Sequence, residues 1–131
     1  MRLLLDTHIA LWAIADHPNL SLKARGLIDD PDNQIVVSTV TIWEIAIKHA
    51  LARGTPNDMP LSGSAALGYF RDAGFEVLNV TAAHVTIIET LAPLHTDPFD
   101  RLLIAQALAT PLRLLTHDNR VAAYSDTIIA V

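Results

Sequence analysis

The stretch Arg2–Leu5, RLLL, leads through Asp6-Thr7 directly into the apolar segment Ile9–Ala15, IALWAIA. A short apolar run followed by Asp-Thr, a good helix-opening pair, predicts a strand, a turn and a helix. The first fifteen residues therefore indicate one strand–helix unit, with Asp6 at the carboxyl end of its strand.

The rest of the chain continues this alternation. We expect further strands at 35–38, 76–80, 113–116 and 127–129, and helices at 21–28, 41–53, 65–73, 82–91, 100–109 and 121–124. Helical stretches between strands indicate crossover connections, and therefore a mostly parallel central sheet with helices on both faces. Because no repeat or linker divides the 131 residues, we expect a single α/β domain over residues 1–131.

The composition excludes several classes of protein. With no Cys, the chain has no disulfides, thiolate metal sites or Cys nucleophiles. Its longest uninterrupted apolar stretch, Ile9–Ala15, is far shorter than the roughly 20 residues of a membrane span. We therefore expect a soluble, cytoplasmic protein without a membrane partner. The formal net charge of −5 argues, taken alone, against a protein that coats nucleic acid.

Four acidic residues fall near the carboxyl ends of the expected strands, where parallel α/β sheets form their sites: Asp6, Glu44, Asp100 and Asp118. Two like charges at about 4 Å repel by roughly 4 kcal/mol at an effective dielectric near 20, so such a cluster favours a bound divalent cation. Oxygen ligands suit Mg²⁺ or Mn²⁺ better than Zn²⁺. With a substrate phosphate, these ions support phosphodiester hydrolysis.

Each acid also has a structural interpretation. Asp6 and Asp118 can cap the helices that follow them. Thr41 and Glu44 have the spacing of a capping box, and Glu44 also has the i,i+4 spacing of an ion pair with Lys48. Convergence of the acids on one sheet edge favours the functional interpretation.

Four blocks carry these residues: LLLDTHIALW at 3–12, VVSTVTIWEIAIK at 36–48, HTDPFDRLLIAQAL at 95–108 and LLTHDNR at 114–120. In sequence and order they resemble PIN-domain proteins, and specifically VapC-type toxin ribonucleases of type II toxin–antitoxin systems. The third block is specific to one branch of that family. The resemblance implies a PIN-like α/β/α domain, Mg²⁺- or Mn²⁺-dependent endoribonuclease activity, and neutralisation by a VapB-type antitoxin.

The resemblance also assigns the acids. Asp6 matches the first family acid, Glu44 the second and Asp118 the fourth. We assign the third to Asp100, one residue from the family spacing, with Asp97 as the alternate; Asp97 also suits a helix N-cap. The metal would then be held by Asp6, Asp100 and Asp118, with Glu44 contacting it through water.

Neighbouring residues would support these acids. Thr7 and Thr116 match family hydroxyls that can orient carboxylates, although both also suit helix or turn capping. Arg101, Lys48 and Arg120 are candidates for contacts with the substrate backbone. The six His do not form a metal-ligand set in the sequence. We expect His17 and His84 at the surface, and the others at the rim of the site or in structural roles: His8, His49, His95 and His117.

The helix expected at 41–53 has apolar residues on two sides. One side can face the core and the other a partner, which with the resemblance indicates a homodimer and an antitoxin groove; the alternative is a fully buried helix. The competing function is a catalytically silent PIN-like module that only binds partners. Haloacid-type phosphatases are disfavoured, because they require an Asp where this chain has His8.

The net charge fits the metal site. Without the four assigned acids, 10 of the 14 acidic residues remain against 9 basic ones. The acidity is therefore mostly that of the site, and it no longer argues against an RNA substrate.

Overall fold

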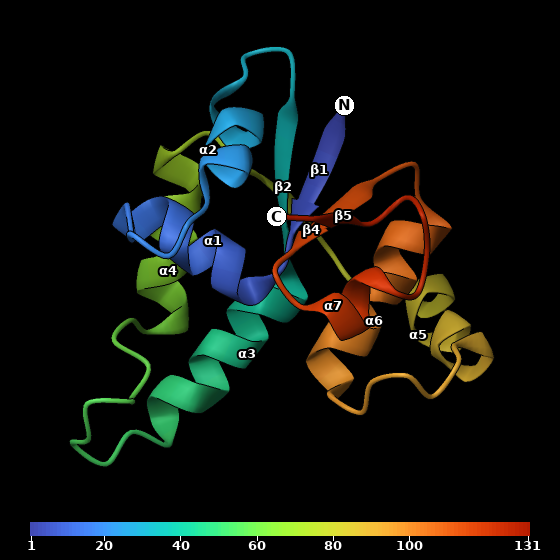
Figure 1. Ribbon diagram of the computed structural model, residues 1–131. Coiled ribbons are helices and arrows are strands. Elements are labelled where there is room, and N and C mark those ends of the chain that lie inside the picture. The colour runs from blue at the N-terminus through green and yellow to red at the C-terminus, as the bar shows by residue number, and fades with distance from the viewer.

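A computed structural model describes residues 1–131 and contains a five-stranded, all-parallel sheet in the order β3-β2-β1-β4-β5 (Figure 1). The strands are β1 (Arg2–Leu5), β2 (Gln34–Ser38), β3 (Glu76–Leu78), β4 (Arg113–Thr116) and β5 (Ile129–Ala130). The helices are α1 (Thr7–Ala15), α2 (Leu22–Asp29), α3 (Thr39–Ala50), α4 (Gly63–Asp72), α5 (Ala82–Ile87), the 3-10 helix η1 (Ile88–Thr90), α6 (Pro98–Ala109) and α7 (Asn119–Ala122). The predicted α/β fold with a parallel sheet is confirmed.

The sheet separates two apolar clusters, and the central strand β1 contributes to both. Leu3 and Leu5 belong to the cluster on one face, and Leu4 to the cluster on the other, because successive residues of a strand point to opposite faces. All three side chains are fully buried. Helices α1, α2 and α4 lie on one side of the sheet and α5 and α6 on the other (Figure 1), which gives three layers.

Helix α3 begins two residues before the predicted start. Ser38, the last residue of β2, is its N-cap, and the Ser38 hydroxyl accepts a hydrogen bond from the Val40 amide at 3.0 Å. The capping box predicted for Thr41 and Glu44 is therefore wrong, because both residues already lie inside the helix. Their side chains are buried and face the interior of the protein.

His84, which we expected at the surface, is instead 4% exposed. It is the third residue of α5 and forms a capping box with Thr81. Its Nδ1 also lies 3.3 Å from Nε2 of the buried Gln106 on α6. The prediction failed because the packing of α5 on α6 is not visible in the local sequence.

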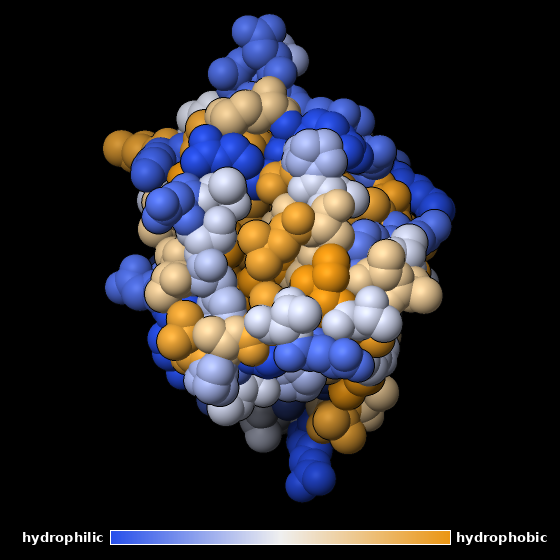
Figure 2. Space-filling model, turned by 90° about the vertical axis from the view of Figure 1, so that its right-hand side faces the viewer, coloured by the Kyte–Doolittle hydropathy of each residue, from blue (hydrophilic) through white to orange (hydrophobic).

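Exposed apolar side chains remain on two separate surfaces. On α3, Trp43 and Ile47 are 50% and 36% exposed, whereas Val40 and Ile45 of the same helix are buried. The second stripe of this helix is thus open, as one of the two interpretations required. Figure 2 shows an apolar area on the side of the molecule where α5 and α6 lie, and Val85 of α5 is 50% exposed. None of the helices has the length and apolar character needed to cross a membrane.

Candidate metal and active site

Asp6 lies at the carboxyl end of β1, in the centre of the sheet, and has two structural contacts. Its Oδ1 accepts a hydrogen bond from the Ile9 amide at 2.9 Å, so Asp6 is the N-cap of α1. Its Oδ2 accepts a hydrogen bond at 2.6 Å from the hydroxyl of Thr116, the last residue of β4. The capping interpretation is therefore confirmed, and it leaves Oδ2 directed toward the neighbouring strand end.

Burial dominates the electrostatics of Asp6, whose exposed fraction is 5%. Desolvation raises the pKa of this carboxyl above its usual value, although the Thr116 hydroxyl, the Ile9 amide and the imidazoles of His117 and His8 oppose the rise. The carboxylate is thus buried without full compensation of its charge. Such a group is suited to bind a cation.

Glu44 projects from α3 toward α1 and is also buried. Its Oε1 accepts a hydrogen bond from the Thr7 hydroxyl at 2.7 Å, and its Oε2 accepts one from Lys48 Nζ at 2.6 Å. Thr41 Oγ1 lies 3.2 Å from Thr7 Oγ1. The predicted i,i+4 ion pair with Lys48 is present, and the Thr7 hydroxyl fixes the orientation of the Glu44 carboxylate.

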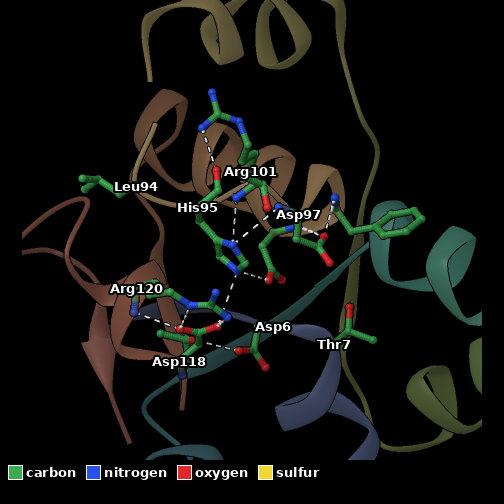
Figure 3. A network of polar contacts seen from close by, with 12 residues as sticks. Asp6, Thr7, Leu94, His95, Asp97, Arg101, Asp118 and Arg120 are labelled. Carbon is green, nitrogen blue, oxygen red and sulfur yellow. Dashed lines mark hydrogen bonds and ion pairs between the residues drawn. The ribbon is translucent and has the colours of Figure 1, made fainter. Parts of the chain in front are cut away.

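His95 joins the two remaining acids (Figure 3). Its Nδ1 accepts hydrogen bonds from the backbone amides of Thr96 and Asp97, so the proton of the neutral ring lies on Nε2. This Nε2 is 2.9 Å from Asp100 Oδ2 and 3.4 Å from Asp118 Oδ2. The predicted role of His95 at the rim of the site or in its structure understates its position, since its imidazole lies between two of the acids.

Asp97 and Asp100 have different roles in the geometry of α6. Asp97 is the N-cap, and its Oδ1 accepts hydrogen bonds from the amides of Phe99 and Asp100 at 2.9 and 3.1 Å. Asp100 instead points to His95. Burial raises the pKa of Asp100 to about 6, and the charges of Asp97, Asp6 and Glu44 add to the rise while His95 opposes it. Asp97, Asp6 and Glu44 therefore lie close enough to act on the Asp100 carboxyl, whereas Asp118 is linked to Asp100 through His95.

Asp118 follows β4 and is the N-cap of α7. Its Oδ1 accepts a hydrogen bond from the Arg120 amide at 2.8 Å, and its Oδ2 lies 3.3 Å from Arg120 Nη2. Burial alone would raise the pKa of Asp118, but the bonds to Arg120 and the charges of Arg120 and His95 hold it below its usual value. Asp118 is therefore an ionised carboxylate beside a largely exposed arginine.

The guanidinium of Arg101 contacts backbone carbonyls and a tyrosine, and none of the site acids. Its guanidinium donates hydrogen bonds to the carbonyl oxygens of Ile88, Ala92 and His95, and to the hydroxyl of Tyr124. These bonds hold the loop that carries His95 (Figure 3). Because the guanidinium is engaged in this way, a substrate contact for Arg101 stays a prediction.

The side chains of His95, Asp100 and Asp118 could hold a metal ion, since one potential ligand atom from each lies within 4.8 Å of the others. In the neutral tautomer described above, however, His95 Nε2 carries a proton and acts as a donor. The ligands that suit a metal here are therefore carboxylate oxygens. The buried and mutually repelling carboxylates fit a hard divalent cation such as Mg²⁺.

The fold and the chain agree with one known family. A profile of the PIN domain matches residues 3–126. Among solved structures, the chain is similar to one in VapBC2 from Rickettsia felis bound to a DNA fragment from their promoter, with a TM-score of 0.70, 19% identity, and coverage of 100% of this chain and 98% of that one. It is also similar to a chain of FitAcB from Neisseria gonorrhoeae, with a TM-score of 0.60, 17% identity, and coverage of 100% and 97%.

The comparison with curated proteins gave no match. At these low identities the structural likeness concerns the fold, whereas the profile match covers nearly all of the chain. The chain belongs to the PIN-domain family.

Proposed function

We propose that this protein, a single PIN domain over residues 1–131, is a Mg²⁺-dependent endoribonuclease toxin that a VapB-type antitoxin neutralises. The observation that carries the proposal is the convergence of the acids on one sheet edge: His95 Nε2 joins Asp100 to Asp118, and burial with the charges of Asp6 and Glu44 raises the pKa of Asp100 to about 6. A site that holds four carboxylates together at such a cost favours a role for a divalent cation.

In the proposed site, Asp6, Asp100 and Asp118 hold the metal, and Glu44 contacts it through water. The ion, Mg²⁺ or alternatively Mn²⁺, would stabilise the negative charge that develops on the phosphoryl group. Asp100 is preferred to Asp97 as the third ligand, because Asp100 and Asp118 belong to the group of side chains whose ligand atoms lie within 4.8 Å of one another, and Asp97 does not.

The residues around the metal ligands have positioning tasks. The Thr7 hydroxyl orients Glu44, which in turn orients the attacking water for in-line displacement at phosphorus. The Thr116 hydroxyl holds Asp6. Lys48 and the largely exposed Arg120 lie beside the acids and contact the phosphates of the substrate backbone.

The central experiment incubates the purified protein with total RNA, with and without Mg²⁺, and maps the new ends by sequencing. We expect Mg²⁺-dependent cleavage at discrete positions that the Asp6→Asn variant does not produce. Equal cleavage by this variant would show that the site assignment is wrong.

The competing function is a catalytically silent PIN-like module. Calorimetry distinguishes the two, because the proposal expects Mg²⁺ binding by the wild type and its loss in the Asp6→Asn, Asp100→Asn double variant. Absence of binding by the wild type would favour the silent module.

The proposal includes two protein partners, an antitoxin and a second copy of this chain. The structural neighbours are chains of VapBC2 and FitAcB, and this chain exposes apolar side chains on α3 and on the side of α5 and α6. A monomeric mass by light scattering at micromolar concentration would contradict the homodimer. A candidate antitoxin should suppress RNA cleavage at a one-to-one ratio.

A further inference from the structure

Four rings from three parts of the chain meet beside the acidic site. The indole of Trp12 lies at their centre, with ring centroids 4.8 Å from His117, 5.8 Å from His8 and 5.9 Å from His17. The rings of Trp12 and His17 are stacked at 23°, and His8 meets His117 edge-on at 5.3 Å. We call these four residues the ring cluster.

The ring cluster lies next to the proposed metal site and opens into a cavity. His117 Nδ1 is 3.9 Å from Asp6 Oδ2. His8, Trp12 and His17 line a cavity of about 780 Å³, whose wall also includes Glu44 and Lys48. That volume lies within the range of small-ligand sites, and a single nucleobase fits well inside it. The cavity thus joins three of the four rings to one acid of the site, Glu44, and to the cation Lys48.

Core packing does not account for the cluster. The side chain of His117 is 41% exposed, and His8 is also exposed. His8 and Trp12 stand one turn apart on the same face of α1, the face that borders the cavity. The imidazoles of His8 and His117 are therefore available to a bound molecule, whereas Trp12 and His17 are partly buried and Trp12 packs against the apolar cluster beneath it.

We infer that the ring cluster is a stacking surface for an unpaired base of the RNA substrate, beside the phosphate that the acids act on. This inference rests on the proposed endoribonuclease function. Nucleobases stack on aromatic and imidazole rings, and single strands are commonly held by such rings together with nearby cations. Lys48 supplies the cation in the same cavity.

The test uses the fluorescence of Trp12. The chain has only two Trp residues, so Trp43→Phe makes Trp12 the sole indole. The protein carries Trp43→Phe and Asp6→Asn, so that it should not cleave RNA. It is titrated in one experiment with a single-stranded RNA of about eight nucleotides, and in another with an abasic oligonucleotide of equal length and charge. We expect the RNA to quench Trp12 and to bind about tenfold more tightly than the abasic chain.

Two variants separate stacking from packing. Trp12→Leu should abolish the preference for the RNA over the abasic chain, measured by anisotropy of a labelled oligonucleotide, whereas Trp12→Phe should retain most of it. If thermal melting shows that Trp12→Leu is unstable, His8→Leu takes its place as the test variant, because His8 is exposed. His8→Leu should then reduce the preference for the RNA over the abasic chain.

Equal binding of the RNA and abasic chains, or absence of quenching, would overturn the inference and leave the cavity to a protein segment. The outcome is distinguishable from failure of the proposed function. Mg²⁺-dependent cleavage by the wild type without base-dependent quenching would contradict only the proposed stacking surface. Base-dependent quenching together with a wild type that cleaves no RNA would contradict only the proposed nuclease activity.

Discussion

The two halves of the acidic site differ in how the protein holds their carboxylates. In the half built from β1 and α3, Asp6 and Glu44 are 5% and 4% exposed and accept hydrogen bonds from threonine hydroxyls. In the half built from α6 and the end of β4, the side chains of Asp100 and Asp118 are 25% and 22% exposed. His95 and Arg120 are their partners.

The difference indicates a division of tasks. Short hydroxyl side chains on strands and helices fix the direction of the buried carboxylates, so that half is prepared before a metal arrives. In the second half, the exposed guanidinium of Arg120 can turn away when a metal takes its place, whereas the buried imidazole of His95 is held by two backbone amides. The buried half should therefore decide whether the site works, and the open half how it responds to metal and pH.

The largest effect is expected in the buried half. Asp6→Asn keeps an N-cap for α1, because Asn caps as well as Asp, but removes a metal ligand. We expect cleavage to fall at least about a hundredfold, with no loss of thermal stability. The matched control is Asp72→Asn at an exposed position, which should leave cleavage unchanged. A comparable loss in both variants would contradict the assignment.

The open half is tested by comparing Asp100→Asn with Asp97→Asn. The first should weaken Mg²⁺ binding about tenfold or more, measured by calorimetry, because it removes a ligand. The second should leave binding nearly unchanged, because Asn can replace Asp97 as N-cap of α6. The reverse order of affinities would make Asp97 the third ligand.

A smaller effect is expected for Thr116→Val, which removes the hydroxyl that donates to Asp6 Oδ2 and accepts from the Asp118 amide. This hydroxyl spans both halves, and its loss should reduce cleavage by about tenfold. Thr86→Val, on the exposed side of α5, serves as control. Full activity of Thr116→Val would show that Asp6 needs no such support.

The smallest effect concerns pH in the metal-free protein. The pKa of Asp100 rises from 3.8 to about 6 on folding, so the folded state holds a proton that the unfolded state has lost, and stability falls as pH rises through this range. The full shift corresponds to about 3 kcal/mol, which solvent screening at a partly exposed carboxyl reduces to about 1 kcal/mol.

Denaturant unfolding between pH 4 and 6 measures this slope. Asp100→Asn should remove the share of Asp100, and the residual slope belongs to Asp6, whose pKa is also raised. The pKa of Asp118 is lowered instead, so its contribution lies below pH 3.8 and outside the window. An unchanged slope in Asp100→Asn would exclude repulsion at Asp100 as its source.

Much of the fold was predictable because its signals are local. The run RLLL before Asp6, and the β-branched residues of β2, mark strands whose parallel direction follows from crossover connections. The caps at Asp6, Asp97 and Asp118 were also visible in the sequence. The start of α3 was misplaced, because Ser38 was assigned only to a strand although it also caps the following helix.

The contacts within the site were less predictable, because they join distant parts of the chain. His95 was predicted only at the rim of the site or in a structural role, because its place between Asp100 and Asp118 depends on how the loop folds back before α6. Arg101 stands beside Asp100 in the sequence, yet its guanidinium is directed by the carbonyls of the 88–95 segment and by Tyr124. Neighbours in sequence on a helix point in different directions, and tertiary contacts decide the rest.

The hydrogen bond between Asp6 and Thr116 joins residues 110 positions apart, so it can form only late in the synthesis of the chain. A ribosome synthesises Asp6 early and the end of β4 late, and the gap at about 5–20 residues per second is on the order of ten seconds. During that interval the growing chain lacks Asp118 and cannot complete the acidic site. Under the proposed function, a nascent chain is harmless to the RNA around it, and an interrupted translation product never becomes a nuclease.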